Sequence, residues 1–126
     1  MAENKTILIA EDSSVILNLT KKILELQKYK ILTAKNGGEV IKQVENNKID
    51  AILMDLNIPV KSGMDCTREI RAHENPEIAK IPIIAVTGNA NNYSMDDFKE
   101  AGINDYLPKP LDFDALVTTV KKYTAE

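Results

Sequence analysis

The sequence lacks the features that mark membrane-spanning, secreted and nucleic-acid-binding proteins. No apolar run approaches the roughly 18 residues of a membrane span, and no basic segment followed by an apolar one opens the chain. The 16 Lys and Arg residues are scattered among 19 Asp and Glu, so the net charge of −3 provides no cationic surface for DNA or RNA. We therefore expect a cytoplasmic protein that binds neither a membrane nor, directly, a nucleic acid.

Cysteine, internal repeats and linker segments are equally scarce. The single cysteine, Cys66, lies among Met64, Thr67 and Ile70 in a predicted helix, which predicts a packed, reduced thiol without a chemical role. No complete G-x-G-x-x-G motif follows the first apolar run, so the sequence offers no dinucleotide-binding loop there. Repeats, low-complexity tracts and linkers are absent, and we expect one domain over residues 1–126 without an effector domain.

The sequence does contain five short apolar, β-branched runs that alternate with five helical patterns. The predicted strands are residues 6–10, 30–34, 51–54, 83–86 and 105–107. The predicted helices begin after Ser13 or Ser14, after Asn36-Gly37-Gly38, after Gly63, at Tyr93 and after Asp112. Such alternation is typical of βαβ units, and it predicts an α/β fold whose parallel sheet is covered by helices on both faces.

Three acidic residues stand at the ends of two predicted strands. Glu11 and Asp12 follow the first strand, and Asp55 follows the third. If these strands are neighbours, their carboxylates converge at the carboxyl edge of the sheet, where open α/β sheets place ligands. Like charges about 4 Å apart repel by roughly 4 kcal/mol at an effective dielectric near 20. The cluster therefore predicts a counter-cation, either Mg²⁺ or a nearby lysine.

Polar groups also follow the fourth and fifth predicted strands. Thr87 and Gly88 combine a hydroxyl with a position where backbone N–H groups can approach a phosphate, and Lys109 supplies a cation. A carboxylate such as Asp55, on an irregular loop, can meet a metal and still present one oxygen to an electrophile. Metal-binding acids, a nucleophile, a hydroxyl and a cation together favour phosphoryl transfer, in which positioning and charge neutralisation supply most of the catalysis.

At these positions the chain resembles the receiver domains of two-component response regulators, including those fused to hybrid histidine kinases. The resemblance spans nearly the whole chain and rests on Glu11-Asp12, Asp55 with Pro59 and Gly63, Thr87-Gly88, and Tyr106 with Leu107-Pro108-Lys109-Pro110. It implies a flavodoxin-like (βα)₅ fold with strand order 2-1-3-4-5. It also implies that Asp55 accepts a phosphoryl group from a phosphohistidine of a histidine kinase or a histidine phosphotransfer protein.

The resemblance also implies roles for the other residues at the strand ends. Mg²⁺ would be bound by Asp12, Asp55 and the backbone carbonyl of Asn57, with Glu11 acting largely through water. Lys109 would pair with Asp55 and later with the phosphoryl group, while the Thr87 hydroxyl and the backbones of Asn57 and Gly88 would contact phosphoryl oxygens. The Lys109-Pro110 peptide bond is expected to be cis, which would help to aim the lysine.

Two further implications concern the output and the lifetime of the signal. Tyr106 would rotate into the space left when Thr87 moves inward, and the output face would combine the fourth helix, the fifth strand and the fifth helix. Asn57 and Asn89 occupy the positions that tune hydrolysis, and neither offers a carboxylate to orient water. We therefore expect a signalling switch with slow autodephosphorylation rather than a turnover enzyme.

Other interpretations remain open at this stage. A Mg²⁺-dependent phosphatase would need an acid where Asn57 stands, and a flavodoxin-type cofactor protein would need hydroxyls and glycines where Glu11 and Asp12 stand. A receiver-like module that is never phosphorylated is disfavoured because every required side chain is present. The chain is either a stand-alone regulator or a receiver excised from a hybrid kinase. His73, near a helix end, is expected to be a solvated residue and not a phosphoacceptor.

Overall fold

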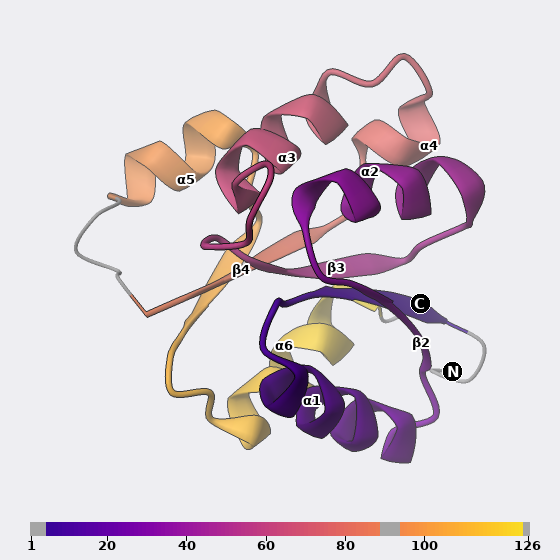
Figure 1. Cartoon of the computed structure of the whole chain (residues 1–126), viewed down its shortest axis with the longest axis vertical. Helices are drawn as coiled ribbons and strands as arrows, with labels where there is room; N and C mark the ends of the chain where they lie inside the picture. The colour runs from indigo at the N-terminus through magenta and orange to yellow at the C-terminus, as the bar shows by residue number, and fades with distance from the viewer. Residues whose placement is uncertain (1–4, 89–93, 125–126) are drawn as a thin grey trace.

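The computed structural model describes residues 5–88 and 94–124, and its centre is a parallel sheet of five strands (Figure 1). The strands are β1 (Thr6–Ala10), β2 (Lys30–Ala34), β3 (Ala51–Asp55), β4 (Ile83–Thr87) and β5 (Asp105–Pro108). Their spatial order is β2-β1-β3-β4-β5, and every neighbouring pair is parallel. The predicted fold class and strand order are confirmed. The order reverses direction between β1 and β3, which is where such sheets bind ligands.

Helices cover both faces of the sheet, as Figure 1 shows. One face carries α1 (Ser14–Leu26) and α6 (Phe113–Thr124), and the other carries α2 (Gly37–Asn46), α3 (Gly63–Arg71), α4 (Pro76–Ala79) and α5 (Met95–Ala101). Alternate residues of β1 enter different cores: Ile7 and Ile9 pack with Leu24 of α1, whereas Leu8 packs with Val40 of α2. The two-residue period of a strand therefore divides the apolar residues between the two layers. None of the described helices has the length and apolar character needed to cross a membrane.

The helix ends refine the sequence-based prediction. Ser13, not Ser14, caps α1, accepting a hydrogen bond from the backbone N–H of Ile16 at 3.4 Å. The predicted start of the fourth helix at Tyr93 lies outside the described residues, and the described helix α5 begins at Met95 behind a capping box on Ser94. The short helix α4 was not predicted, because its four residues are too few to show a helical period.

The start of α2 also differs from the prediction. The helix was expected to begin after Gly37 and Gly38, but they are its first two residues, and Asn36 caps it. The Asn36 side chain accepts a hydrogen bond from the backbone N–H of Glu39 at 2.9 Å. An asparagine cap satisfies a free N–H group of the first turn, so the helix begins although glycine is a poor helix former.

The half-buried guanidinium of Arg71 ties the end of α3 to two other segments, residues 79–81 and 102–104. It donates to the carbonyl oxygen of Gly102 at 2.9 Å, to those of Ala79 and Ile81 at 2.8 and 2.7 Å, and to Asn104 Oδ1 at 2.7 Å. Burial lowers the pKa of Arg71, yet the planar fork stays charged and satisfies four acceptors at once. The side chain thereby fixes α5 and the start of β4 relative to α3.

Replacing Arg71 with lysine should destabilise the protein by about 2 kcal/mol, because one ammonium cannot reach acceptors spread around a planar fork and each abandoned acceptor costs about 1–3 kcal/mol. The measurement is urea unfolding at an unchanged m-value. Arg68→Lys is the matched control, since Arg68 lies on the same helix and its ion pairs with Asp65 and Glu100 are exposed, so its effect should stay within about 0.5 kcal/mol. Equal effects of the two substitutions would contradict this account of Arg71.

Candidate functional site

The three acidic residues predicted to converge do so at the carboxyl edge of the sheet. Asp55 is the last residue of β3, and Glu11 and Asp12 follow β1 directly; Ala10 of β1 pairs with Met54 of β3, which brings the acids together. One carboxylate oxygen from each of Glu11, Asp12 and Asp55 lies within 4.8 Å of the other two. Asp12 is exposed, whereas Glu11 and Asp55 are only 4% and 2% exposed, so the cluster is buried on one side and open on the other.

Burial raises the pKa of Glu11, and repulsion by the nearby Asp55 carboxylate adds to the increase. The backbone N–H of Ser13 opposes this effect by donating to Glu11 Oε2 at 3.1 Å. Sequence reasoning missed this contact. The signal that was available is the position of Glu11 two residues before the N-cap of α1, because acids are favoured beside the free N–H groups of a helix start.

Lys109 supplies the cation that the sequence predicted. It follows the last residue of β5, and its Nζ lies 2.9 Å from Asp55 Oδ2 and 3.5 Å from Glu11 Oε1. Partial burial by itself would lower the pKa of Lys109, but the hydrogen bond and charge of Asp55, with the charge of Glu11, outweigh burial and raise it. The lysine is therefore charged at neutral pH, and it balances one of the three carboxylates. The peptide bond between Lys109 and Pro110 is cis, as expected.

The remaining predicted groups lie on the neighbouring strand ends. The backbone N–H of Asn57 donates to Asp55 Oδ1 at 2.9 Å, which fixes the orientation of the Asp55 carboxylate. Thr87 is the last residue of β4 and is buried, and its backbone carbonyl accepts a hydrogen bond from the Lys109 N–H at 2.9 Å. A Cβ on Gly88 would meet Lys109 side-chain carbons at 3.7–3.8 Å, so an alanine would also fit there.

The donor set fits a hard divalent cation. Three carboxylates face a single lysine, which leaves an uncompensated negative charge among oxygen ligands of the kind Mg²⁺ prefers. The cluster is also open to solvent at Asp12, so a partly hydrated ion can enter. Glu11, Asp12, Asp55 and the backbone carbonyl of Asn57 are the groups that could hold it.

Other residues singled out in the sequence fall in different places. The half-buried ring of Tyr106 packs on Phe98 of α5, with ring centroids 5.5 Å apart, which places it between β5 and α5. His73 lies beyond α3 and pairs with Glu45 of α2, with 3.2 Å between Nε2 and Oε2, so it is not part of the acidic cluster.

Cys66 is fully buried, and burial raises the pKa of its thiol to about 11, as expected for a packed, reduced thiol. Asn89 lies outside the described residues.

Comparison with known proteins shows which proteins this chain resembles. The family model described as "Response regulator receiver domain" matches residues 7–121. The chain is 37% identical to the CAI-1 autoinducer sensor kinase/phosphatase CqsS of Vibrio cholerae over 92% of its own length, but it spans only 17% of that protein. It is 28% identical to the polar-differentiation response regulator DivK of Brucella anthropi, covering 97% of this chain and 98% of DivK.

A solved structure of similar sequence has the same fold. The receiver domain of a sensor histidine kinase from Pseudomonas aeruginosa, with a magnesium ion coordinated in its active-site cleft, superimposes with a TM-score of 0.86. It is 34% identical in sequence, and the match covers 97% of this chain and 98% of that domain. The fold and the strand order are thus shared with proteins of this class.

Replacing Lys109 with methionine should strengthen Mg²⁺ binding in the absence of phosphate, because the ammonium repels a second cation at Asp55. We expect the Kd to fall by roughly tenfold, a fraction of the roughly 4 kcal/mol between unit charges about 4 Å apart at an effective dielectric of 20. Isothermal titration of Mg²⁺ measures it. Lys122→Met, which removes an exposed lysine 3.8 Å from Asp105, should leave the Kd unchanged. Weaker binding by the Lys109 variant would show that the lysine supports the metal site instead of competing with it.

Proposed function

The chain belongs to the receiver domains of response regulators, and from this membership and the geometry of its site we propose that it accepts a phosphoryl group on Asp55. The receiver domain would extend over residues 1–126. The observation that carries the proposal is the surroundings of Asp55: a buried carboxylate held by Lys109 Nζ at 2.9 Å and by the Asn57 N–H at 2.9 Å, beside two further acids. A buried acid with two fixed donors is oriented, and an oriented nucleophile is what phosphoryl transfer requires.

The reaction is a displacement at phosphorus. A carboxylate oxygen of Asp55 forms a bond to the phosphorus of a phosphohistidine while the phosphorus–nitrogen bond breaks, and the leaving imidazole takes up a proton. Lys109 exchanges Asp55 for a phosphoryl oxygen, and the Thr87 hydroxyl and the backbone N–H groups of Asn57 and Gly88 donate to the other oxygens. Lys109 stays charged throughout because its pKa is raised by the acids around it.

Mg²⁺ is the cofactor that we propose for this step. Asp12, Asp55 and the Asn57 carbonyl would hold the ion, with Glu11 acting through water, and the ion would supply charge neutralisation for the phosphoryl oxygens. The negative charge left over after Lys109 is counted supports this assignment.

Signal output would follow from a movement of Thr87 towards the phosphoryl group. Thr87 is buried at the end of β4, and its backbone is joined to that of Lys109, so a shift there reaches β5. Tyr106 on β5 rotates into the space vacated, leaving its present place beside Phe98 of α5. The surface formed by α5, β5 and α6 is then the face that reports phosphorylation to a downstream effector. Lys122, which lies 3.8 Å from Asp105, contributes charge to it.

The phosphoryl donor is a histidine kinase or a histidine phosphotransfer protein in the cytoplasm. The relatives support two possible settings for the chain, a stand-alone regulator or one domain of a longer kinase. The match covers 98% of DivK but only 17% of the sensor kinase CqsS. In either setting, the acids and the lysine at the proposed site, Glu11, Asp12, Asp55 and Lys109, all come from this chain.

Incubation with acetyl phosphate and Mg²⁺ should add one phosphoryl group to the protein, and intact-mass spectrometry should detect it. Asp55→Asn should abolish the adduct, since an amide oxygen is a poor nucleophile. Asp65→Asn is the matched control, because Asp65 is an exposed acid on the first turn of α3 and its loss should leave the adduct intact. An adduct that persists in Asp55→Asn would refute the assignment of the phosphoacceptor.

Asn89→Glu should shorten the lifetime of the phosphorylated protein. Neither Asn57 nor Asn89 offers a carboxylate to orient water, and a positioned general base accelerates hydrolysis by about 10²–10⁴-fold, so we expect decay to quicken by roughly tenfold or more. The decay is followed by intact mass after removal of acetyl phosphate. Asn91→Glu, two residues further along the same segment, serves as the control. If the decay of Asn89→Glu were as slow as that of the wild type, the proposed tuning role would fail.

A further inference from the structure

The loop that follows Asp55, residues 56–62, is held at its tip by the first turn of α2. The backbone N–H of Gly37 donates to the carbonyl oxygen of Pro59 at 3.1 Å, and the same oxygen accepts the N–H of Lys61 at 2.9 Å. One carbonyl therefore joins the tip of the loop to a helix that begins 22 positions earlier in the chain. This contact lies outside the acidic cluster, and none of the steps at Asp55 uses it.

The tip of this loop has a strained backbone. The hydrogen bond from Lys61 to Pro59 closes a three-residue turn around Val60, whose φ is +73°. Turns of this kind are rare, and a positive φ is costly for a β-branched residue. Val60 is also 84% exposed, so burial of its side chain does not offset the strain. Such a conformation persists only where neighbouring contacts impose it, and the bond from Gly37 is such a contact.

Only glycine allows α2 to approach the loop this closely. A Cβ on Gly37 would lie 2.3 Å from the Lys61 carbonyl oxygen, 2.6 Å from Lys61 Cβ and 2.8 Å from Cys66 Sγ. The nearest of these is a backbone atom, which cannot turn aside. Among residues 5–88 and 94–124, a Cβ on the adjacent Gly38 would meet only the flexible side chain of Asn36, at Oδ1 and 3.3 Å. The two glycines therefore differ in their surroundings although they share one turn of helix.

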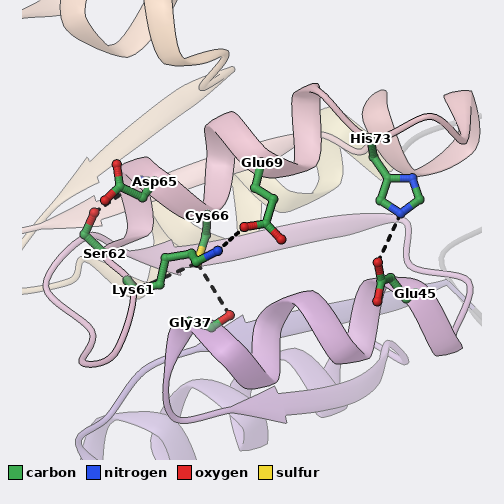
Figure 2. A network of polar contacts seen from close by, with 8 residues as sticks. All are labelled: Gly37, Glu45, Lys61, Ser62, Asp65, Cys66, Glu69 and His73. Atoms are coloured by element: carbon green, nitrogen blue, oxygen red, sulfur yellow. Dashed lines mark hydrogen bonds and ion pairs between the residues drawn. The ribbon is translucent and has the colours of Figure 1, made fainter.

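Cys66 of α3 completes the contact, as Figure 2 shows. Its Sγ lies 3.6 Å from the Gly37 carbonyl oxygen and 3.7 Å from that of Lys61, within reach of a weak S–H hydrogen bond to either. The thiol is fully buried and stays protonated, so it remains a donor. Lys61 in turn forms an ion pair with Glu69 of the same helix. The loop is thus enclosed by α2 on one side and α3 on the other.

We propose that Gly37 is a positioning residue for the phosphoacceptor site, because the docking of α2 on the loop sets the position of Asn57 and thereby the affinity of the site for Mg²⁺. The path between them is short and stiff. Pro59 has a restricted φ, Ile58 is 5% exposed in the core, and the Asn57 N–H holds Asp55 Oδ1 at 2.9 Å. A displacement of Pro59 therefore also displaces Asn57, because the residues between them have little freedom to adjust. This inference rests on the proposed function of Asp55.

The test compares Gly37→Ala with Gly38→Ala, which make the same chemical change in the same turn. Groups that orient metal ligands typically change metal affinity by about 10–100-fold, so we expect Gly37→Ala to raise the Kd for Mg²⁺ by roughly tenfold. Gly38→Ala should stay close to the wild type. Isothermal titration of Mg²⁺ measures the Kd, and hydrogen exchange of residues 57–61 without metal should quicken only in Gly37→Ala.

Phosphorylation by acetyl phosphate provides a second readout. Gly37→Ala should need a higher Mg²⁺ concentration for half-maximal labelling of Asp55, yet it should still be labelled at saturating Mg²⁺. A lower Tm with an unchanged Kd and unchanged exchange would show that Gly37 serves stability alone, and the inference would be overturned. Failure of the wild type itself to bind Mg²⁺ or to take up a phosphoryl group would instead overturn the proposed function.

Cys66 variants keep the proposal testable if Gly37→Ala does not fold. Cys66→Ala removes the donor between the two carbonyls and should weaken Mg²⁺ binding, whereas Cys66→Ser retains a donor and should lie closer to the wild type. A Kd for Cys66→Ala equal to that of the wild type, in a protein that takes up the phosphoryl group normally, would overturn the inference and leave the function of Asp55 intact.

Discussion

The mutual repulsion of three carboxylates at one edge of the sheet is the constraint on which the rest of the structure depends. Glu11, Asp12 and Asp55 lie together although burial and neighbouring charge raise the pKa of Glu11. Lys109 offsets part of this cost by direct contact with Asp55 and Glu11. An arrangement of this kind does not favour stability, because buried charges lose their hydration and a single ion-pair partner compensates for only part of that loss. It is suited to a site that gains further positive charge from a ligand.

The two apolar cores make this arrangement possible. β1 and β3 are buried along their whole length, with alternate residues entering the layer of α1 and α6 or the layer of α2 to α5. Rigid, buried strands end at one edge, so the side chains just beyond them are held close without contributing to the packing themselves. The buried length of each strand therefore contributes stability, and the residues at its carboxyl end supply the chemistry. Apolar burial in the two helical layers offsets the free energy that the acidic edge costs.

Contacts that are distant from the acids link this edge to the helical layer. Arg71 joins α3 to the segments before β4 and β5, and Gly37 joins α2 to the loop that leaves Asp55. Apart from Asn104 Oδ1, the acceptors in both contacts are backbone carbonyls, which change little when surface side chains move. The helix α5, which packs on Tyr106 through Phe98, is held at its C-cap residue Gly102 by Arg71. A structural change at Asp55 therefore takes place among helices whose positions relative to the sheet are fixed by several contacts.

The sequence by itself determined the five strands, the parallel sheet and the identity of the charged groups, because strand burial and the residues at strand ends are local properties of the chain. It also predicted Cys66 as a packed thiol. It did not reveal α4, which is too short to show a period, or the start of α2 at Gly37. Only the tertiary structure decided that Ser13 supports Glu11, that Arg71 joins three segments, and that Gly37 lacks space for a side chain. The contacts of Arg71 and the close approach at Gly37 depend on atoms brought together from distant parts of the chain, and the contact of Ser13 depends on the backbone geometry at the start of α1.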